Sequence, residues 1–135
     1  NPVTSLSSLA DMFHVVRGIA AASDPREVGD FTLHYSRRQM QDYMAQRDLF
    51  EGKRRFIDVA FNDIVAQPLA IIENIYCTAG IELTPAARAA MHQWDRDNPQ
   101  HKHGKRDYRP EKYGYTEARL RDGMAHYIER FSPYM

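Results

Sequence analysis

One strand-like segment lies among amphipathic helices, and this combination constrains the fold more than any other feature of the sequence. Residues 54–61 (RRFIDVAF) are short and largely apolar, which is typical of a strand covered on both faces. A lone strand leaves its backbone N–H and C=O groups unpaired, which is costly when they are buried. Either this strand prediction is wrong, or the neighbouring strands lie outside these 135 residues.

The rest of the sequence predicts four or five helices. Apolar residues at three- and four-residue steps predict an amphipathic helix from Val3 to about Ala22, which Asp24-Pro25 is expected to close. A second, polar helix is expected from about Asp30 to Leu49. Three more are predicted by their start and stop signals: from Pro68 to the residue before Gly80, from Thr84-Pro85 onward, and after a Thr116 cap.

The composition favours one globular domain over residues 1–135. Lysine and arginine number 18, as do aspartate and glutamate, and this balance argues against nucleic acid as a partner. No run approaches the ~20 apolar residues of a membrane span, so we expect no integral membrane segment. The single cysteine, Cys77, excludes an intrachain disulfide and favours a reducing compartment, so we expect a cytoplasmic location.

A cationic stretch at residues 98–115 (NPQHKHGKRDYRPEKYGY) is the strongest functional signal. A glycine among cations lets the backbone approach an anion while the side chains neutralise it, and the obvious anion is a phosphate. The alternative is a solvated basic loop with a glycine turn. The residues that form the cluster are Lys102, Lys105, Arg106 and Arg109 around Gly104, with His101 and His103 beside them.

Three further patterns in the sequence each have a simpler interpretation. The hydroxyl-rich run Thr4–Ser8 at a helix start could bind phosphate, or it could cap the helix. Tyr108, Tyr113 and Tyr115 could stack on a base, although packing against the fold is favoured for at least two of them. The histidine spacing matches no recognised metal pattern, so no metal site is expected.

Four stretches together resemble the C-terminal half of a sulfotransferase, in particular the bacterial branch of that family. The match spans nearly all of the chain, and the order and spacing of the stretches are more specific than any one of them. The four stretches are residues 1–8 (NPVTSLSS), 56–68 (FIDVAFNDIVAQP), 98–105 (NPQHKHGK) and 127–131 (YIERF).

The resemblance implies an α/β fold of the P-loop-like sulfotransferase type, of which this chain would be a mostly helical C-terminal fragment with one clear strand. It implies 3′-phosphoadenosine 5′-phosphosulfate (PAPS) as donor and a small-molecule, lipid or glycan acceptor. A serine of the first segment and the late basic loop bind the 3′-phosphate in the family. The expected contacts are Ser8, Lys102, His103 and Gly104, with Lys105 and Arg106 beside them.

The chain also departs from the family pattern. The family arginine would stand directly before Asn1, and the loop that holds the 5′-phosphosulfate, most of the sheet and the catalytic base would lie further upstream. We therefore expect these residues to be part of a longer enzyme, inactive without its N-terminal part. Two other interpretations stay open: a small helical interaction domain with a basic anion-binding loop, and a related P-loop enzyme such as a nucleotide kinase.

Overall fold

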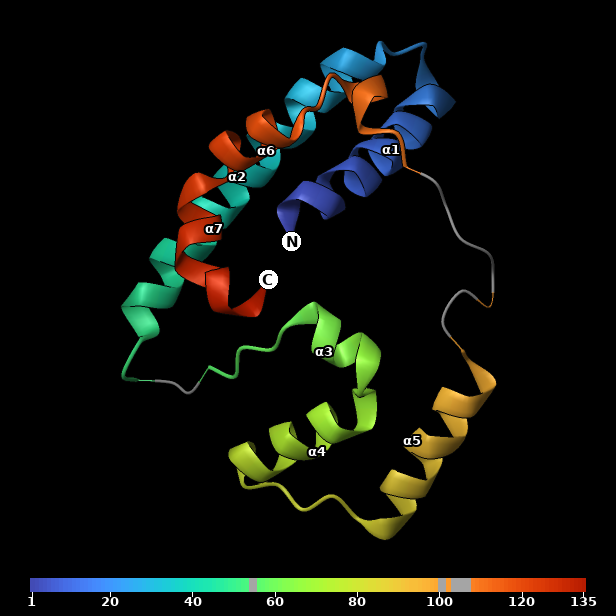
Figure 1. Cartoon of the computed structure of the whole chain (residues 1–135), viewed down its shortest axis with the longest axis vertical. Helices are drawn as coiled ribbons and strands as arrows, with labels where there is room; N and C mark the ends of the chain where they lie inside the picture. Colours follow the sequence, from blue (N-terminus) through green and yellow to red (C-terminus); the bar gives the residue numbers. More distant parts are fainter. Residues whose placement is uncertain (54–55, 100–101, 103–107) are drawn as a thin grey trace. The chain divides into compact units, whose positions relative to one another are not determined.

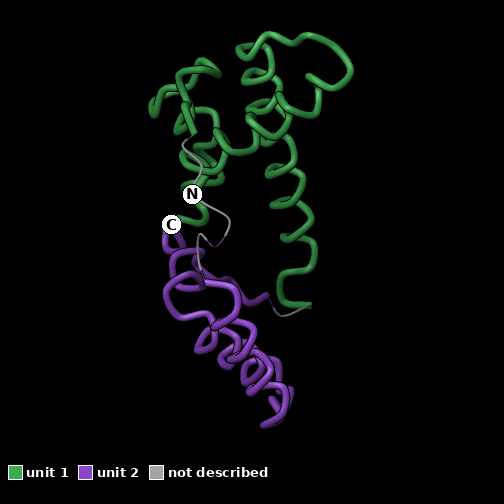
Figure 2. The backbone as a smooth tube through the Cα atoms, turned by 90° about the vertical axis from the view of Figure 1, so that its right-hand side faces the viewer, with its two compact units in different colours: residues 1–54, 107–132 green, residues 55–106, 133–135 purple. Residues whose placement is uncertain are grey.

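The computed structural model describes residues 1–53, 56–99, 102 and 108–135. The chain forms two compact units, coloured separately in Figure 2. Unit 1 comprises Asn1–Arg54 and Asp107–Ser132, and unit 2 comprises Arg55–Arg106 and Pro133–Met135. Each unit is described by itself below, and the expectation of a single domain over 1–135 stays a prediction.

Unit 1 is built from helices that come from both ends of the sequence. The helices α1 and α2 lie side by side, and the late helices α6 and α7 pack along α2 (Figure 1). A short 3₁₀ helix, η1, packs against α1 and α2 and precedes α6. The bounds are α1 Pro2–Ala20, α2 Pro25–Phe50, η1 Pro110–Tyr113, α6 Glu117–Gly123 and α7 Ala125–Phe131. The short 3₁₀ helix η2 (Ser132–Tyr134) begins at the last residue of unit 1 and continues into unit 2.

The helix starts follow local sequence signals, with one correction. Asp24 accepts a hydrogen bond from the Arg26 amide at 2.8 Å, and Pro25 occupies the first turn of α2. We expected Asp24-Pro25 to close the first helix and the second to begin near Asp30. Instead α1 ends at Ala20 and α2 begins at Pro25, because aspartate at the cap and proline at the first position start a helix well.

The core of unit 1 joins the N-terminal helices to the C-terminal segment. Tyr113 and Tyr115 are almost completely buried, and both contact the α1–α2 pair. Burying side chains from distant parts of the sequence is the main favourable term that holds these segments together. The buried hydrophobic residues of this cluster are Leu6, Ala10, Val28, Tyr113, Tyr115, Leu120 and Met124.

Unit 2 contains α3 (Phe61–Ala66), α4 (Pro68–Ala79) and α5 (Pro85–Asp97). Gly80 ends α4 with a positive φ of 70°, and the Thr84 hydroxyl caps α5, which confirms both predicted boundaries. An ion pair between Glu73 and Arg88 joins α4 to α5. No described residue of these three helices is buried. None of the helices in the described ranges combines the length and apolar character needed to cross a bilayer.

The strand expected at residues 54–61 is not found. Residues 54–55 lie outside the described residues, residues 56–60 have no regular secondary structure, and Phe61 begins α3. A strand needs a neighbour to pair its backbone groups, and no β-strand element occurs in the part of the chain that the structure describes. The structure therefore supports the expected mostly helical character and does not confirm the expected strand.

Gly29 provides a test of this packing. A Cβ added to Gly29 would lie 2.1 Å from the backbone oxygen of Tyr113, so α2 and η1 can approach this closely only at a glycine. We expect Gly29→Ala to lower the free energy of unfolding by at least about 2 kcal/mol, because backbone cannot move aside as a side chain can. Urea unfolding of the purified protein measures this value.

Gly18→Ala is the matched control. Gly18 also lies in a helix, but nothing stands within 4 Å of a Cβ added there. Alanine should therefore leave stability unchanged or raise it by up to about 1 kcal/mol through helix propensity. Equal effects of the two substitutions would contradict the close approach of α2 and η1.

Candidate phosphate site

The predicted site residues are distributed over both units. Ser8 lies on α1 in unit 1 and is half-buried. Lys102 is exposed in unit 2, where its ammonium group donates to the Asp97 backbone oxygen at 2.7 Å and to Asn98 Oδ1 at 3.3 Å. Lys102 thus satisfies a carbonyl at the end of α5, a favourable position for a cation.

The remaining predicted contacts, His103, Gly104, Lys105 and Arg106, lie outside the described residues. The convergence of Ser8 with this loop therefore stays a prediction. Within unit 1, however, the structure does join the start of α1 to Tyr108, which belongs to the same basic stretch.

A cavity of about 640 Å³ lies at the start of α1. One wall comes from the first two turns of α1, and the other comes from residues 108–116 and from α6. Its lining residues are Val3, Thr4 and Ser7 from α1, and Tyr108, Pro110, Glu111, Tyr115, Thr116, Glu117 and Leu120 from the other wall.

The first turn of α1 is capped by Asn1 and not by serine or threonine. The Asn1 side chain accepts from the Val3 amide at 3.0 Å, and the Asn1 backbone oxygen accepts from the hydroxyls of Thr4 and Ser5 at 3.0 Å each. These groups are therefore occupied within the helix itself. An anion at this end of α1 would have to depend on other donors.

Ser7 is the exception among these hydroxyl groups. Only 3% of its surface is exposed, its Oγ has no hydrogen-bond partner in the part of the chain that the structure describes, and it lines the cavity. Leaving a buried hydroxyl unpaired costs on the order of 1–3 kcal/mol, so such a group is a candidate for ligand contact. The sequence analysis names Ser8 and not Ser7, because the sequence does not show which hydroxyl of the run Thr4–Ser8 is buried without a partner.

The wall opposite α1 is held by two tyrosines. The Tyr113 hydroxyl donates to Asp11 Oδ1 at 2.7 Å, and Lys112 Nζ lies 3.7 Å from the same oxygen. The Tyr115 hydroxyl donates to the Gly29 backbone oxygen at 2.9 Å. Packing against the fold is therefore confirmed for Tyr113 and Tyr115, whereas Tyr108 is partly exposed and lines the cavity.

The two tyrosines are neutral groups in this environment. Burial, and then the hydrogen bond to the Asp11 carboxylate, raise the pKa of Tyr113 well above its usual value. Burial likewise raises the pKa of Tyr115. Both phenols therefore keep their protons and donate the hydrogen bonds that hold the wall in place.

The described residues that line the cavity at the start of α1 carry a net negative charge. Glu111 and Glu117 contribute carboxylates to the lining, and the lining residues that the structure describes include no lysine or arginine. A phosphate bound here would need cations from outside this described lining. No three potential metal ligands converge within the described ranges.

Comparison with known proteins identifies the family. A model of the sulfotransferase family matches residues 1–85, so the chain belongs to this family. The chain is also similar to a solved structure, the sulfotransferase STF9 from Mycobacterium avium, with a TM-score of 0.82 and 22% sequence identity over 97% of this chain. At this identity the match shows a shared fold. The chain spans about a third (34%) of the length of that protein. No curated protein sequence matches the chain significantly.

The phenol of Tyr113 makes a testable contribution to stability. Removing its hydroxyl by Tyr113→Phe should lower the free energy of unfolding at neutral pH by about 1–3 kcal/mol, because a buried hydrogen bond to a carboxylate is lost. The raised pKa means that the folded protein keeps this proton above about pH 10, where the unfolded chain loses it. Stability should therefore fall as the pH rises above about 10, and more gently in the variant.

Urea unfolding at neutral pH and at about pH 11 measures both effects. Tyr134→Phe is the matched control, because Tyr134 is 40% exposed, whereas Tyr113 is almost completely buried. It should leave both the stability and its pH dependence unchanged. A Tyr113→Phe variant that behaves like this control would contradict the role given to the Tyr113–Asp11 hydrogen bond.

Proposed function

We propose that this chain supplies the 3′-phosphate binding part of a PAPS-dependent sulfotransferase. The full enzyme would transfer a sulfuryl group to a hydroxyl or amine of a small-molecule, lipid or glycan acceptor. Membership of the sulfotransferase family supports this function over a helical interaction domain. The single cysteine in the sequence supports our proposal of a cytoplasmic location.

One observation carries the proposal of a nucleotide phosphate at the start of α1. The buried, unpartnered hydroxyl of Ser7 lines the same cavity as Tyr108, the last aromatic residue before the chain turns into η1. A phosphate oxygen would satisfy this hydroxyl, and Tyr108 would offer an aromatic face to the nucleoside. The dimensions of the cavity, about 640 Å³, suit part of a nucleotide.

The cations that the phosphate requires would come from the basic stretch. We propose that Lys102, His103, Gly104, Lys105 and Arg106 contact the phosphate, together with Ser8 from α1. Arg106 precedes Tyr108 by only two residues in the sequence. Lys102 uses two acceptors at the end of α5, and its ammonium group has a third donor for a phosphate oxygen.

The reaction itself would depend on residues beyond this chain. In-line displacement breaks the bond between sulfur and the bridging phosphate oxygen and forms a bond from sulfur to the acceptor oxygen or nitrogen. The acceptor proton passes to a base, and 3′-phosphoadenosine 5′-phosphate leaves. This chain would contribute binding and orientation of the nucleotide, and we propose that the base and the 5′-phosphosulfate loop belong to the N-terminal part of the enzyme.

Calorimetric titration of the intact protein with 3′-phosphoadenosine 5′-phosphate tests this function. We expect saturable binding in the micromolar range, weakened roughly 100-fold when Ser8→Ala and Lys102→Ala are combined, because two charge-assisted contacts are removed. The absence of saturable binding, or an affinity that the double variant leaves unchanged, would refute the proposed phosphate site.

Ser7→Ala separates ligand contact from packing. Ser36 is the matched control, because it is also buried with an unpartnered Oγ but does not line the cavity at the start of α1. We expect Ser7→Ala to weaken binding of the nucleotide roughly tenfold and Ser36→Ala to leave it within about twofold. Equal effects on binding would show that the Ser7 hydroxyl does not contact the ligand.

A further inference from the structure

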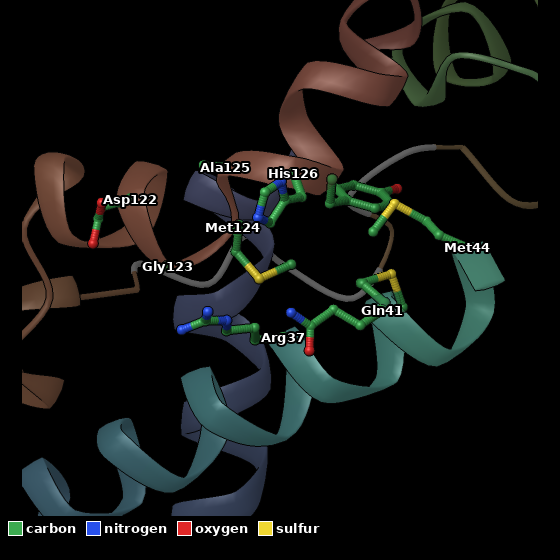
Figure 3. A pocket seen from close by; sticks show the side chains of 10 residues that line it. Arg37, Gln41, Met44, Asp122, Gly123, Met124, Ala125 and His126 are labelled. Carbon is green, nitrogen blue, oxygen red and sulfur yellow. The ribbon is translucent and has the colours of Figure 1, made fainter.

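A groove of unit 1 between α2 and the α6–α7 junction contains an arginine that has no partner among the residues that the structure describes. Three neighbouring cavities of about 240, 220 and 300 Å³ lie along it, and Arg37 lines all three. Figure 3 shows Arg37 and Gln41 on α2 facing Met124 and His126 across the first of these cavities. The groove shares no lining residue with the cavity at the start of α1.

Arg37 differs from the arginines around it. It is exposed and forms no hydrogen bond or ion pair with any residue that the structure describes. Arg38 is paired with Asp42 at 3.1 Å, and Arg119 is paired with Asp30 at 2.5 Å, so these two acids are already neutralised. The guanidinium of Arg37 is therefore available to an external anion.

The other end of the groove is apolar. Met124 is buried, and Met40, Met44 and Tyr127 are half-buried along the first cavity. Methionine side chains are flexible and polarizable, so they adapt to apolar ligands of varied shape. A cation next to an adaptable apolar surface suits a ligand that has an anionic group and an apolar group.

We propose that this groove binds a small molecule with one anionic head and a short apolar tail. The planar fork of Arg37 matches a carboxylate or a sulfate ester, and the tail would lie on Met40, Met44 and Met124. The Asp122 carboxylate lines two of the cavities and disfavours a doubly charged head. A cavity of about 240 Å³ holds on the order of eight water-sized groups, which fits a chain of about six carbons.

Methionine-methyl NMR of the intact protein, titrated with hexyl sulfate and separately with hexanoate, tests this site. We expect saturable shifts of the methyl signals of Met40, Met44 and Met124 with at least one of the two anions. Met12, Met91 and Met135 line none of the three cavities and should not shift. Hexanol and inorganic sulfate should bind at least tenfold more weakly than the better anion.

Two variants decide the role of the guanidinium. Arg37→Gln should weaken binding at least tenfold, whereas Arg121→Gln should leave it within about twofold, because Arg121 is paired with Glu117 and lines none of the three cavities. Four results would overturn the proposal: no saturable shift with either anion, shifts spread over all the methionines, hexanol binding as tightly, or an Arg37→Gln variant that binds normally. None of these results depends on nucleotide binding at α1.

Discussion

The close approach of η1 to α2 at Gly29 is the contact on which the rest of unit 1 depends. The backbone of Tyr113 lies where a side chain at position 29 would place its Cβ. The Tyr115 hydroxyl donates a hydrogen bond to the Gly29 carbonyl, 86 residues away in the sequence. The hydrogen bond from Tyr113 to Asp11 fixes the same segment to α1. Two phenols of raised pKa and one glycine thus hold the late segment against the N-terminal helices.

This contact also builds the cavity that we propose as part of a nucleotide site. One wall is the start of α1 with its unpartnered Ser7, and the other follows the basic stretch through Tyr108. The described lining contains two carboxylates and no cation, so the phosphate site that we propose would need cations from outside this lining.

The sequence was informative where local chemistry decides the outcome. The stop at Gly80 and the cap at Thr84 follow from residue type alone, and the family resemblance rested on ordered motifs. The sequence was less informative where secondary structure depends on neighbouring segments. The strand expected at residues 54–61 is an example, because a strand requires a second strand to pair its backbone groups. Asp24-Pro25 was misassigned because the same pair can end one helix or begin the next. The role that we propose for Ser7 rests on its buried hydroxyl, which has no hydrogen-bond partner in the described part of the chain. Only a three-dimensional structure shows such a missing partner.

The most direct measurement is a crystal structure of the intact protein with 3′-phosphoadenosine 5′-phosphate bound. The account predicts that the 3′-phosphate lies within hydrogen-bond distance of a serine hydroxyl on α1, Ser7 or Ser8, and of at least one cation among residues 102–106. A nucleotide whose 3′-phosphate contacts neither α1 nor the basic stretch would contradict it.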